Sequence, residues 1–368
     1  MVGVVQKNLG FGCMRLPMLG DQVDLKQVRV MVDAFLEAGF NYFDTAHGYI
    51  GGLSEKALCE CLTKRYPREK YILADKLSES YFNTEEEVRP YVRTMLDCCG
   101  VSYFDYFLMH AQNRNNYPKF KKCRAYETAF QLKKEGVIRH FGISFHDTAD
   151  VLEMILQEHP EIEFVQIQMN YLDWDDPGVQ SRKCYEICEK YGKQVIIMEP
   201  VKGGKLAALP AEGHEVFAGL GSASDASYAV RFAASHPNVM MVLSGMSSTD
   251  QMRDNISTMQ EFVPLSDFEL EAVWKVREIL RGENVIPCTN CRYCVDGCPK
   301  QIPIPDLFSC LNARSLQKDV DTRAQYRAFT EGRGLASDCI KCGKCEHSCP
   351  QHLEIRKLLE RAARAYDR

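Results

Sequence analysis

Hydrophobic and polar positions follow two alternating patterns from residue 9 to about residue 255. Short runs, nearly continuous in apolar residues, are each followed by a longer run whose apolar residues recur about every 3.6 positions, as in an amphipathic helix. The first of these helices carries Val28, Met31, Val32, Phe35 and Leu36 on one face. The short runs are typical of parallel strands that are buried on both faces of a sheet.

This alternation predicts eight strand–helix pairs. The predicted strands are 9–16, 41–46, 71–77, 104–110, 138–144, 164–171, 194–200 and 239–245. The predicted helices are 25–38, 54–64, 84–98, 126–134, 148–157, 178–191, 225–235 and 249–256. Eight such units are the number that closes a (β/α)8 TIM barrel. An open doubly wound sheet is less favoured, because "LGFGCM" lacks the full Gly-x-Gly-x-x-Gly of such folds.

The pattern changes after residue 280. The stretch 281–287, "RGENVIP", is typical of a linker, and two cysteine-rich runs follow at 288–299 and 339–350. A helical segment is predicted between them at 307–329, and a C-terminal helix in "LEIRKLLERAARAY". We therefore expect an α/β protein with a barrel domain at 1–280 and a small, mainly helical domain at 281–368.

Composition narrows the class of protein. With 45% hydrophobic and 26% charged residues, the 368-residue chain resembles an ordinary globular protein. A net charge of -5 gives no reason to expect nucleic acid. No apolar run is long enough to cross a membrane, and "MVGVVQKNLG" lacks the regions of a signal peptide. We therefore expect a cytoplasmic protein, a setting that also suits its 17 cysteines.

Polar residues at the ends of three consecutive strands are the candidate catalytic groups. Asp44 and Tyr49 follow the second strand in "FDTAHGY", Lys76 ends the third and His110 ends the fourth. Strand ends of a barrel meet at one mouth, so these four side chains should converge. Each alone would more often be a cap or a surface residue, but four together are hard to explain as structure.

The four residue types suit the reduction of a carbonyl group by hydride. The oxygen that gains negative charge needs a proton donor, and Tyr49 can serve. A neighbouring Lys76 would lower the pKa of the tyrosine, and Asp44 would hold the lysine in place. His110 would hydrogen-bond the carbonyl oxygen and orient it.

Both cysteine runs have the form Cys-x2-Cys-x2-Cys-x3-Cys-Pro, which is the spacing of bacterial [4Fe–4S] ferredoxins. In that pattern the fourth cysteine of each run reaches the cluster of the other run. One predicted ligand set is Cys288, Cys291, Cys294 and Cys349, and the other is Cys339, Cys342, Cys345 and Cys298. Structural zinc is disfavoured, because it takes four ligands in paired Cys-x2-Cys units or with histidine.

The barrel resembles the aldo/keto reductase family. "FDTAHGY" is similar to the family's Asp–Thr–Ala–x–x–Tyr signature, "GLSEKALCE" to the Gly-x-Ser-Glu continuation, and the resemblance covers about 9–256. It implies that Asp44, Tyr49, Lys76 and His110 are the catalytic tetrad, with Tyr49 as general acid. The two cysteine runs, 40 residues apart, resemble the larger helical ferredoxins, and the whole chain resembles the iron–sulfur branch of the family.

The resemblance also implies a nicotinamide cofactor across the barrel mouth. Candidate contacts at matching positions are Ser144, Gln168, Asn170, Met198, Gly245, Ser247, Gln251 and Asn255. Met198 stands where the family usually has an aromatic residue that stacks on the nicotinamide. The loop after strand eight, 244–251, has no lysine or arginine for a 2′-phosphate, so NADP(H) and NAD(H) both stay open.

Hydride transfer moves two electrons, whereas a [4Fe–4S] cluster passes one. Three hypotheses follow. The first is a carbonyl reductase or alcohol dehydrogenase that uses NAD(P)H, with clusters that exchange electrons with a ferredoxin or another electron-transfer protein. The second is a flavin- or ferredoxin-linked reductase on the same barrel, since a flavin handles one- and two-electron steps. The third is an electron-transfer module with a non-catalytic barrel.

Overall fold

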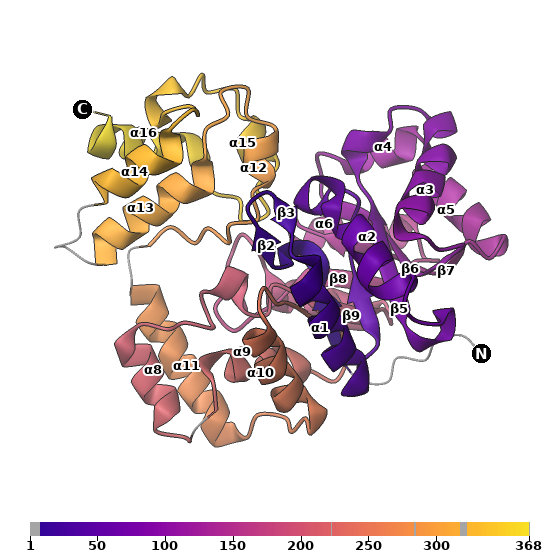
Figure 1. Ribbon diagram of the computed structural model, residues 1–368, viewed down its shortest axis with the longest axis horizontal. Coiled ribbons are helices and arrows are strands. Elements are labelled where there is room, and N and C mark those ends of the chain that lie inside the picture. Colours follow the sequence, from indigo (N-terminus) through magenta and orange to yellow (C-terminus); the bar gives the residue numbers. More distant parts are fainter. Residues whose placement is uncertain (1–7, 222, 283–284, 317–321, 368) are drawn as a thin grey trace.

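Eight parallel strands close into a barrel in the computed structural model, which describes residues 8–221, 223–282, 285–316 and 322–367 (Figure 1). The strands are β1 (Leu9–Gly12), β4 (Tyr42–Asp44), β5 (Ile72–Leu77), β6 (Phe104–Gln112), β7 (Ile138–Phe145), β8 (Phe164–Gln168), β9 (Gln194–Met198) and β10 (Val239–Gly245). The order around the barrel is β1-β10-β9-β8-β7-β6-β5-β4. The TIM barrel predicted from the sequence is confirmed.

A helix follows each strand and covers the outside of the barrel. These helices are α1 (Leu25–Glu37), α2 (Leu53–Leu58) with a π-helical continuation at Cys59–Thr63, α3 (Glu85–Cys99), α5 (Ala125–Lys134), α6 (Ala149–Glu158), α7 (Ser181–Lys190), α9 (Asp225–Ala234) and α10 (Thr249–Gln260). Several begin at a capped residue: the side chain of Asp24 accepts a hydrogen bond from Gln27 N, and that of Ser248 from Gln251 N. Such caps satisfy amide groups that the first turn leaves free.

Some elements were missed in the sequence. They are the hairpin β2 (Met18–Leu19) and β3 (Gln22–Val23), and the helices α4 (Tyr117–Lys122), α8 (Ala211–Ala218) and α11 (Asp267–Gly282). The hairpin strands have two residues each, too few for a period to appear. Because α11 continues to Gly282, the first two residues of the predicted linker are helical, and residues 283–284 lie outside the described residues.

Side chains alternate along each strand between the helices and the barrel interior. The interior is filled by Tyr42, Ile72, Ala74, Leu108, Phe164, Ile196, Met241 and Leu243. Gly142 belongs to this layer, where a Cβ atom would lie 2.6 Å from the Phe164 ring, so glycine leaves room for that ring. Two positions further along the same strands come the polar residues of the barrel mouth.

The C-terminal domain is small and helical, as predicted. Its helices are α12 (Tyr293–Asp296), α13 (Ile304–Leu316), α14 (Arg323–Thr330), α15 (Lys344–His347) and α16 (Ile355–Tyr366). The helical segment expected at 307–329 consists of two helices, α13 and α14, and residues 317–321 between them lie outside the described residues. A separate hydrophobic core, which includes Ile304, Phe308 and Leu359, holds this domain together.

The C-terminal domain packs on the barrel mouth, beside β2 and β3 (Figure 1). Arg15 donates a hydrogen bond to Thr289 O at 2.7 Å, and the side-chain amides of Gln168 and Gln351 bond to each other at 2.9 and 3.2 Å. Gly203 lies so close that a Cβ atom would be 2.5 Å from Thr289 O. These contacts bring one domain's loops to the other's strand ends.

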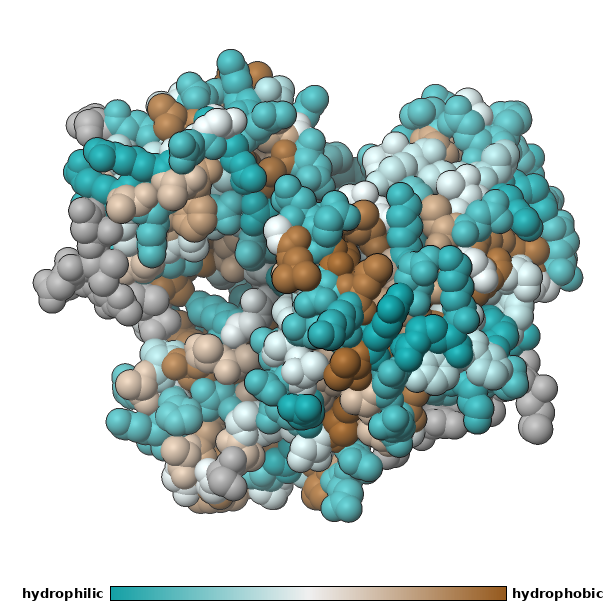
Figure 2. Space-filling model, in the orientation of Figure 1, coloured by the Kyte–Doolittle hydropathy of each residue, from teal (hydrophilic) through white to brown (hydrophobic). Residues whose placement is uncertain are grey.

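The surface seen in Figure 2 is mostly hydrophilic, with hydrophobic side chains gathered near β2 and β3, where Met18 and Leu19 are exposed. Among the described helices, none is both long and apolar enough to span a bilayer.

Candidate active site

The four candidate catalytic residues meet at the barrel mouth. The ammonium of Lys76, fully buried, donates to Asp44 Oδ1 at 2.6 Å, to Thr45 O at 2.8 Å and to Tyr49 OH at 3.2 Å. The ring of His110 lies edge-on to that of Tyr49, with centroids 5.8 Å apart. The strand ends thus bring together the side chains that the sequence predicts to converge.

A tight turn after β4 positions Tyr49. Residues Tyr49–Gly52 form a short 3-10 turn in which Gly51 and Gly52 have φ of +60° and +84°, a conformation that glycine adopts without strain. Ser54 then donates to Cys13 O at 2.9 Å and lies 2.8 Å from Thr45 Oγ1. The turn is therefore tied to the end of β1.

Burial governs the protonation of Tyr49. Removal from water raises the pKa of Tyr49, and the Asp44 carboxylate adds to that effect, while a side-chain hydrogen bond from Tyr293 opposes it. The prediction that Lys76 lowers the pKa of Tyr49 is therefore wrong: burial dominates, and the ammonium of Lys76 is paired with Asp44. Tyr49 is consequently held as the neutral phenol, the form that can donate a proton.

Burial also holds His110 in its neutral form. Burial lowers its pKa well below the usual range, and the positive charge of Lys76 adds to this. Its Nδ1 atom lies 2.5 Å from Ser78 Oγ. If the serine hydroxyl donates to Nδ1, the ring hydrogen is on Nε2, where it can bond to a substrate oxygen.

Two cavities meet at Tyr49 and His110. Cavity A has a volume of about 510 Å³ and is lined by residues of β8, β9, β10 and the loop that follows β10. Cavity B has a volume of about 670 Å³ and is lined by the loops after β5, β6 and β7 together with residues 346–350 and His352. Both volumes are typical of small-molecule sites.

Seven of the eight predicted cofactor contacts line cavity A. They are Ser144, Gln168, Met198, Gly245, Ser247, Gln251 and Asn255. Asn170 is not among the residues of that lining, because β8 ends at Gln168 and the Asn170 amide donates to Asp173 Oδ2 and Glu199 O. Gln168 is partly engaged as well, since it bonds to Asp173 and Gln351.

Other residues of the site were missed in the sequence. Gln166 lines cavity A, and its buried Oε1 atom has no hydrogen-bond partner among the described residues. It lies two positions before Gln168 on β8, so the period of a strand could have indicated it. Arg15 lies against Gly245, and its carbonyl oxygen accepts a hydrogen bond from the Ser247 hydroxyl. Its guanidinium points to the other domain: it donates to Thr289 O and pairs with Glu199.

The C-terminal domain adds its own residues to the cavities. Cys291 and Tyr293 line cavity A, and the Tyr293 ring lies 6.3 Å from the His110 ring. Lys202 pairs with Asp173 and donates to Gln351 Oε1 at 3.1 Å. No sequence pattern indicated these contacts, since they depend on how the two domains dock.

The eight cysteines of the two runs surround two small cavities of the C-terminal domain. One is lined by Cys288, Cys291, Cys294 and Cys349, and the other by Cys298, Cys339, Cys342 and Cys345. Each set is the one expected from the crossed ferredoxin pattern. Four thiolates around one space are the donor set that a [4Fe–4S] cluster needs.

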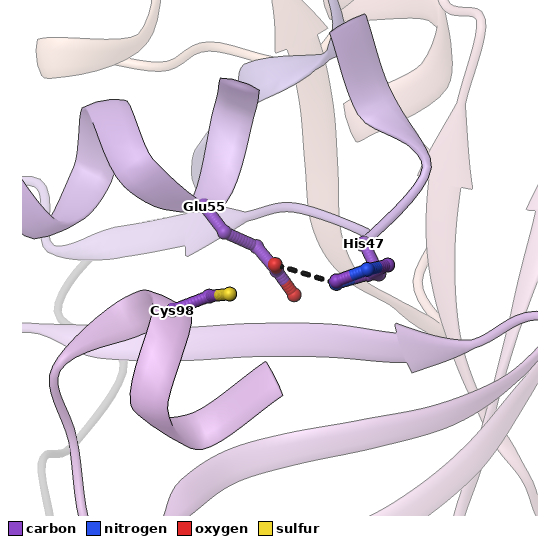
Figure 3. Close-up of side chains that lie close together, drawn as sticks. All are labelled: His47, Glu55 and Cys98. Atoms are coloured by element: carbon purple, nitrogen blue, oxygen red, sulfur yellow. Dashed lines mark hydrogen bonds and ion pairs between the residues drawn. The ribbon is translucent and has the colours of Figure 1, made fainter. Parts of the chain in front are cut away.

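A buried polar cluster lies behind the site, between β5 and helices α2 and α3 (Figure 3). Glu55 Oε2 lies 2.7 Å from His47 Nδ1, and Cys98 approaches the same carboxyl group from α3. Burial raises the pKa of Glu55 to about 7, and the neighbouring Asp75 carboxyl also has a raised pKa because it is buried beside Glu55. Both carboxyl groups therefore tend towards the neutral, protonated form in the folded protein.

Comparisons with known proteins find matches to both domains of the chain. The profile of the aldo/keto reductase family matches residues 8–278, and the profile of the 4Fe-4S dicluster domain matches residues 287–354. L-galactose dehydrogenase of Arabidopsis thaliana is 26% identical over 300 residues, which are 76% of this chain and 92% of that protein. An uncharacterized oxidoreductase of Bacillus subtilis, YqkF, is 24% identical over 282 residues, 68% of this chain and 86% of that protein.

Solved structures show the same barrel. Aldo-keto reductase AKR11C1 from Bacillus halodurans, in its holo form, superimposes with a TM-score of 0.58 at 26% identity and covers 73% of this chain and 91% of its own. An aldo-keto reductase from Klebsiella pneumoniae in complex with NADPH has a TM-score of 0.60 at 16% identity, over 74% of this chain and 96% of its own, which shows the fold alone.

Fold, site and family profile together define an oxidoreductase built on a (β/α)8 barrel. The chain belongs to the aldo/keto reductase family, and it carries a 4Fe-4S dicluster domain after the barrel.

Proposed function

We propose that the protein is a cytoplasmic carbonyl reductase, or an alcohol dehydrogenase in the reverse direction, that uses NAD(P)H and exchanges single electrons with a redox partner through two [4Fe–4S] clusters. The observation that carries the proposal is the Asp44–Lys76–Tyr49 chain of hydrogen bonds, with His110 beside it, at the point where cavities A and B meet. A barrel that served as a scaffold alone would have no need of a buried ion pair beside a cavity.

The side chains can handle the proton in this reaction. In the reducing direction the carbonyl oxygen gains negative charge and takes the proton of the Tyr49 hydroxyl. Lys76 then faces the phenolate at hydrogen-bonding distance and stabilises it. His110 donates a hydrogen bond to the same substrate oxygen, and the buried surroundings strengthen that bond.

Cavity A is the proposed cofactor site, and a nicotinamide bound there supplies the hydride. The buried Asn255 Oδ1 has no partner among the described residues, so it can accept a bond from an adenine amino group. Gln166 Oε1, equally unpaired, and Ser144 can bond to a carboxamide. The NADPH of the Klebsiella pneumoniae structure, on a barrel of the same fold, supports this assignment.

The eight cysteines are the proposed cluster ligands, in the two crossed sets. Cys342 is exposed, whereas Cys291 lines cavity A. The second cluster would therefore lie near the surface, where a ferredoxin or another electron-transfer protein can dock, and the first would lie beside the cofactor. This order suits the passage of single electrons between a partner and the barrel.

A flavin-linked reductase is the second candidate, favoured by the presence of Cys291 in the lining of cavity A. Electrons that leave a cluster one at a time need a carrier that can also deliver two, and a flavin does both. Acid extraction of the anaerobically purified protein separates the candidates. Release of a flavin supports the second, and its absence from the extract contradicts it.

The test of the first candidate is the oxidation of NADPH and NADH, measured at 340 nm with a set of aldehydes and ketones. We expect turnover in the wild type and a loss of about 10²-fold or more in Tyr49→Phe, because the general acid is removed. Tyr191→Phe, at a tyrosine that bonds to Glu153 and lines neither cavity, is the control and should keep its activity. Wild-type protein that neither binds nor oxidises NAD(P)H with any carbonyl would refute the proposal. Cluster reoxidation that Tyr49→Phe leaves unchanged, without carbonyl turnover in the wild type, would favour the scaffold hypothesis.

A further inference from the structure

Tyr293 belongs to the dicluster domain, yet it stands in the active site of the barrel. We propose that Tyr293 is a specificity-determining residue: its ring separates the cofactor cavity from the substrate cavity, and its hydroxyl contacts the substrate oxygen. The proposal rests on the function proposed above and adds that cavity B receives the carbonyl substrate.

The position of Tyr293 is the first argument. It begins α12, between Cys291 and Cys294, and its ring meets the His110 ring edge-on at 84°, with centroids 6.3 Å apart. Like Tyr49 and His110, Tyr293 lines both cavities. A carbonyl oxygen that binds to both Tyr49 and His110 therefore lies beside Tyr293.

The shape of the two cavities is the second argument. Among the described residues, cavities A and B share Tyr49, His110, His146, Tyr293 and Pro350. Tyr293 and Pro350 come from the dicluster domain, so this domain forms one side of the partition. A substrate in cavity B reaches a cofactor in cavity A between these shared residues, and the Tyr293 ring is the large side chain that the dicluster domain contributes there, so it limits the width of the substrate at its reacting end.

The chemistry of cavity B is the third argument. Its lining combines apolar surface with the polar side chains of Asn113, Arg114 and Asn116, which already bond to Ala111 O and Asp147 and are thereby held in place. Cavity A already contains the predicted cofactor contacts. The larger cavity B is thus the space left for a carbonyl compound, and Tyr293 lies where it meets cavity A.

Two variants test the proposal in the holoprotein. Tyr293→Ala removes the partition, and Tyr293→Phe removes the hydroxyl alone. Tyr366→Phe is the matched control, because this tyrosine of the same domain bonds to Cys310 O and Thr322, far along the chain from the barrel contacts. The measurements are kcat and KM for propanal and for acetophenone, the Kd of NADPH by fluorescence, and cluster absorbance in the visible range.

In Tyr293→Ala we expect the ratio of kcat/KM for acetophenone over propanal to rise by about tenfold or more, because a steric limit is removed. In Tyr293→Phe we expect an unchanged ratio, with KM for both substrates raised by about threefold to tenfold, since one hydrogen bond is lost. The Kd of NADPH and the cluster absorbance should match those of the control.

An unchanged substrate ratio and unchanged KM values in both variants would overturn the proposal. If Tyr293→Ala loses cluster absorbance, the KM values of Tyr293→Phe alone test the proposal: raised values support it, and unchanged values overturn it. If the wild type turns over no carbonyl, the proposed function fails by itself. The role of Tyr293 is then tested by the binding of a fluorescent naphthyl methyl ketone. Its Kd should rise in Tyr293→Phe and stay unchanged in Tyr366→Phe. Equal Kd values in the two variants would contradict the proposed role of Tyr293.

Discussion

At the scale of single residues, Lys76 illustrates how burial and chemistry are linked. Its ammonium has no exposed surface, and Asp44 Oδ1, Thr45 O and Tyr49 OH surround it. Burial of an ion pair costs desolvation energy, and removal of one partner leaves the other charge uncompensated. The hydrogen bonds that hold Lys76 in the fold are therefore the same ones that aim it at Tyr49.

Glu55 provides a test at this scale. Burial raises its pKa from an ordinary value of 4.5 to about 7, so between these values the folded protein binds more protons than the unfolded chain. Stability from Glu55 is therefore complete below pH 4.5 and is lost as the pH rises through 7. The loss is at most about 3.4 kcal/mol, because each pKa unit corresponds to about 1.36 kcal/mol.

We therefore expect Glu55→Gln to be less sensitive to pH than the wild type in urea unfolding between pH 5 and pH 8. Glutamine does not titrate, so the variant should lose less stability over this range. Glu60→Gln, at an exposed glutamate that pairs with Lys64 one turn further along, is the control and should follow the wild type. Identical pH dependence in Glu55→Gln and the wild type would contradict the expectation.

At the scale of elements, the turn after β9 carries the contact between the domains. Gly203 and Gly204 both have positive φ, at +65° and +96°. A Cβ atom on Gly203 would lie 2.5 Å from Thr289 O, whereas nothing lies within 4 Å of one on Gly204. Both glycines adopt a positive φ, but the dicluster domain approaches closely only at Gly203.

Gly203→Ala should therefore weaken docking more than Gly204→Ala does. Overpacking of this kind costs about 1–3 kcal/mol, which makes the undocked form roughly tenfold more common. We expect protease cleavage between the barrel and the dicluster domain to be faster by a similar factor in Gly203→Ala, since cleavage follows the population of the open form. Equal rates in the two variants would show that Gly203 is required for its backbone conformation alone.

The sequence predicted local features of this fold well. Each strand has its own apolar run, and the tetrad could be located because Lys76 and His110 end such runs. Short elements escaped prediction, since β2 has two residues and α12 has four, and about one period is too little for a pattern to repeat. Arg15 and Tyr293 escaped for a different reason: their place in the site depends on the docking of two domains, which no local pattern encodes.

At the scale of the whole molecule, the proposed crossed ligation would tie the two cysteine runs together. Cys349 lines the cavity of the first run, and Cys298 that of the second. Each serine variant of a ligand should lower the iron content from about eight atoms towards about four, because one cluster of four irons is lost. Crossed and uncrossed ligation are distinguished by which of the two clusters is lost in each variant.

We expect the EPR spectrum of reduced Cys349→Ser to match that of Cys288→Ser, and the spectrum of Cys298→Ser to match that of Cys339→Ser. In each pair the same cluster is removed and the same one remains. Cys310→Ala is the control, because Cys310 lies in the domain core and lines neither cavity, and it should keep both clusters. A match between Cys288→Ser and Cys298→Ser would instead show that each run binds its own cluster.

The crossed ligand sets also have a consequence for the order of events during synthesis. A ribosome makes the chain from residue 1 onward, so the barrel strands emerge before either cysteine run. In the proposed crossed sets the first cluster lacks a ligand until Cys349 has been made, and Gln351, which bonds to Gln168 at the barrel mouth, follows two residues later. The contact of this last segment with the barrel mouth can therefore form only once the ligands of both clusters are present in the chain.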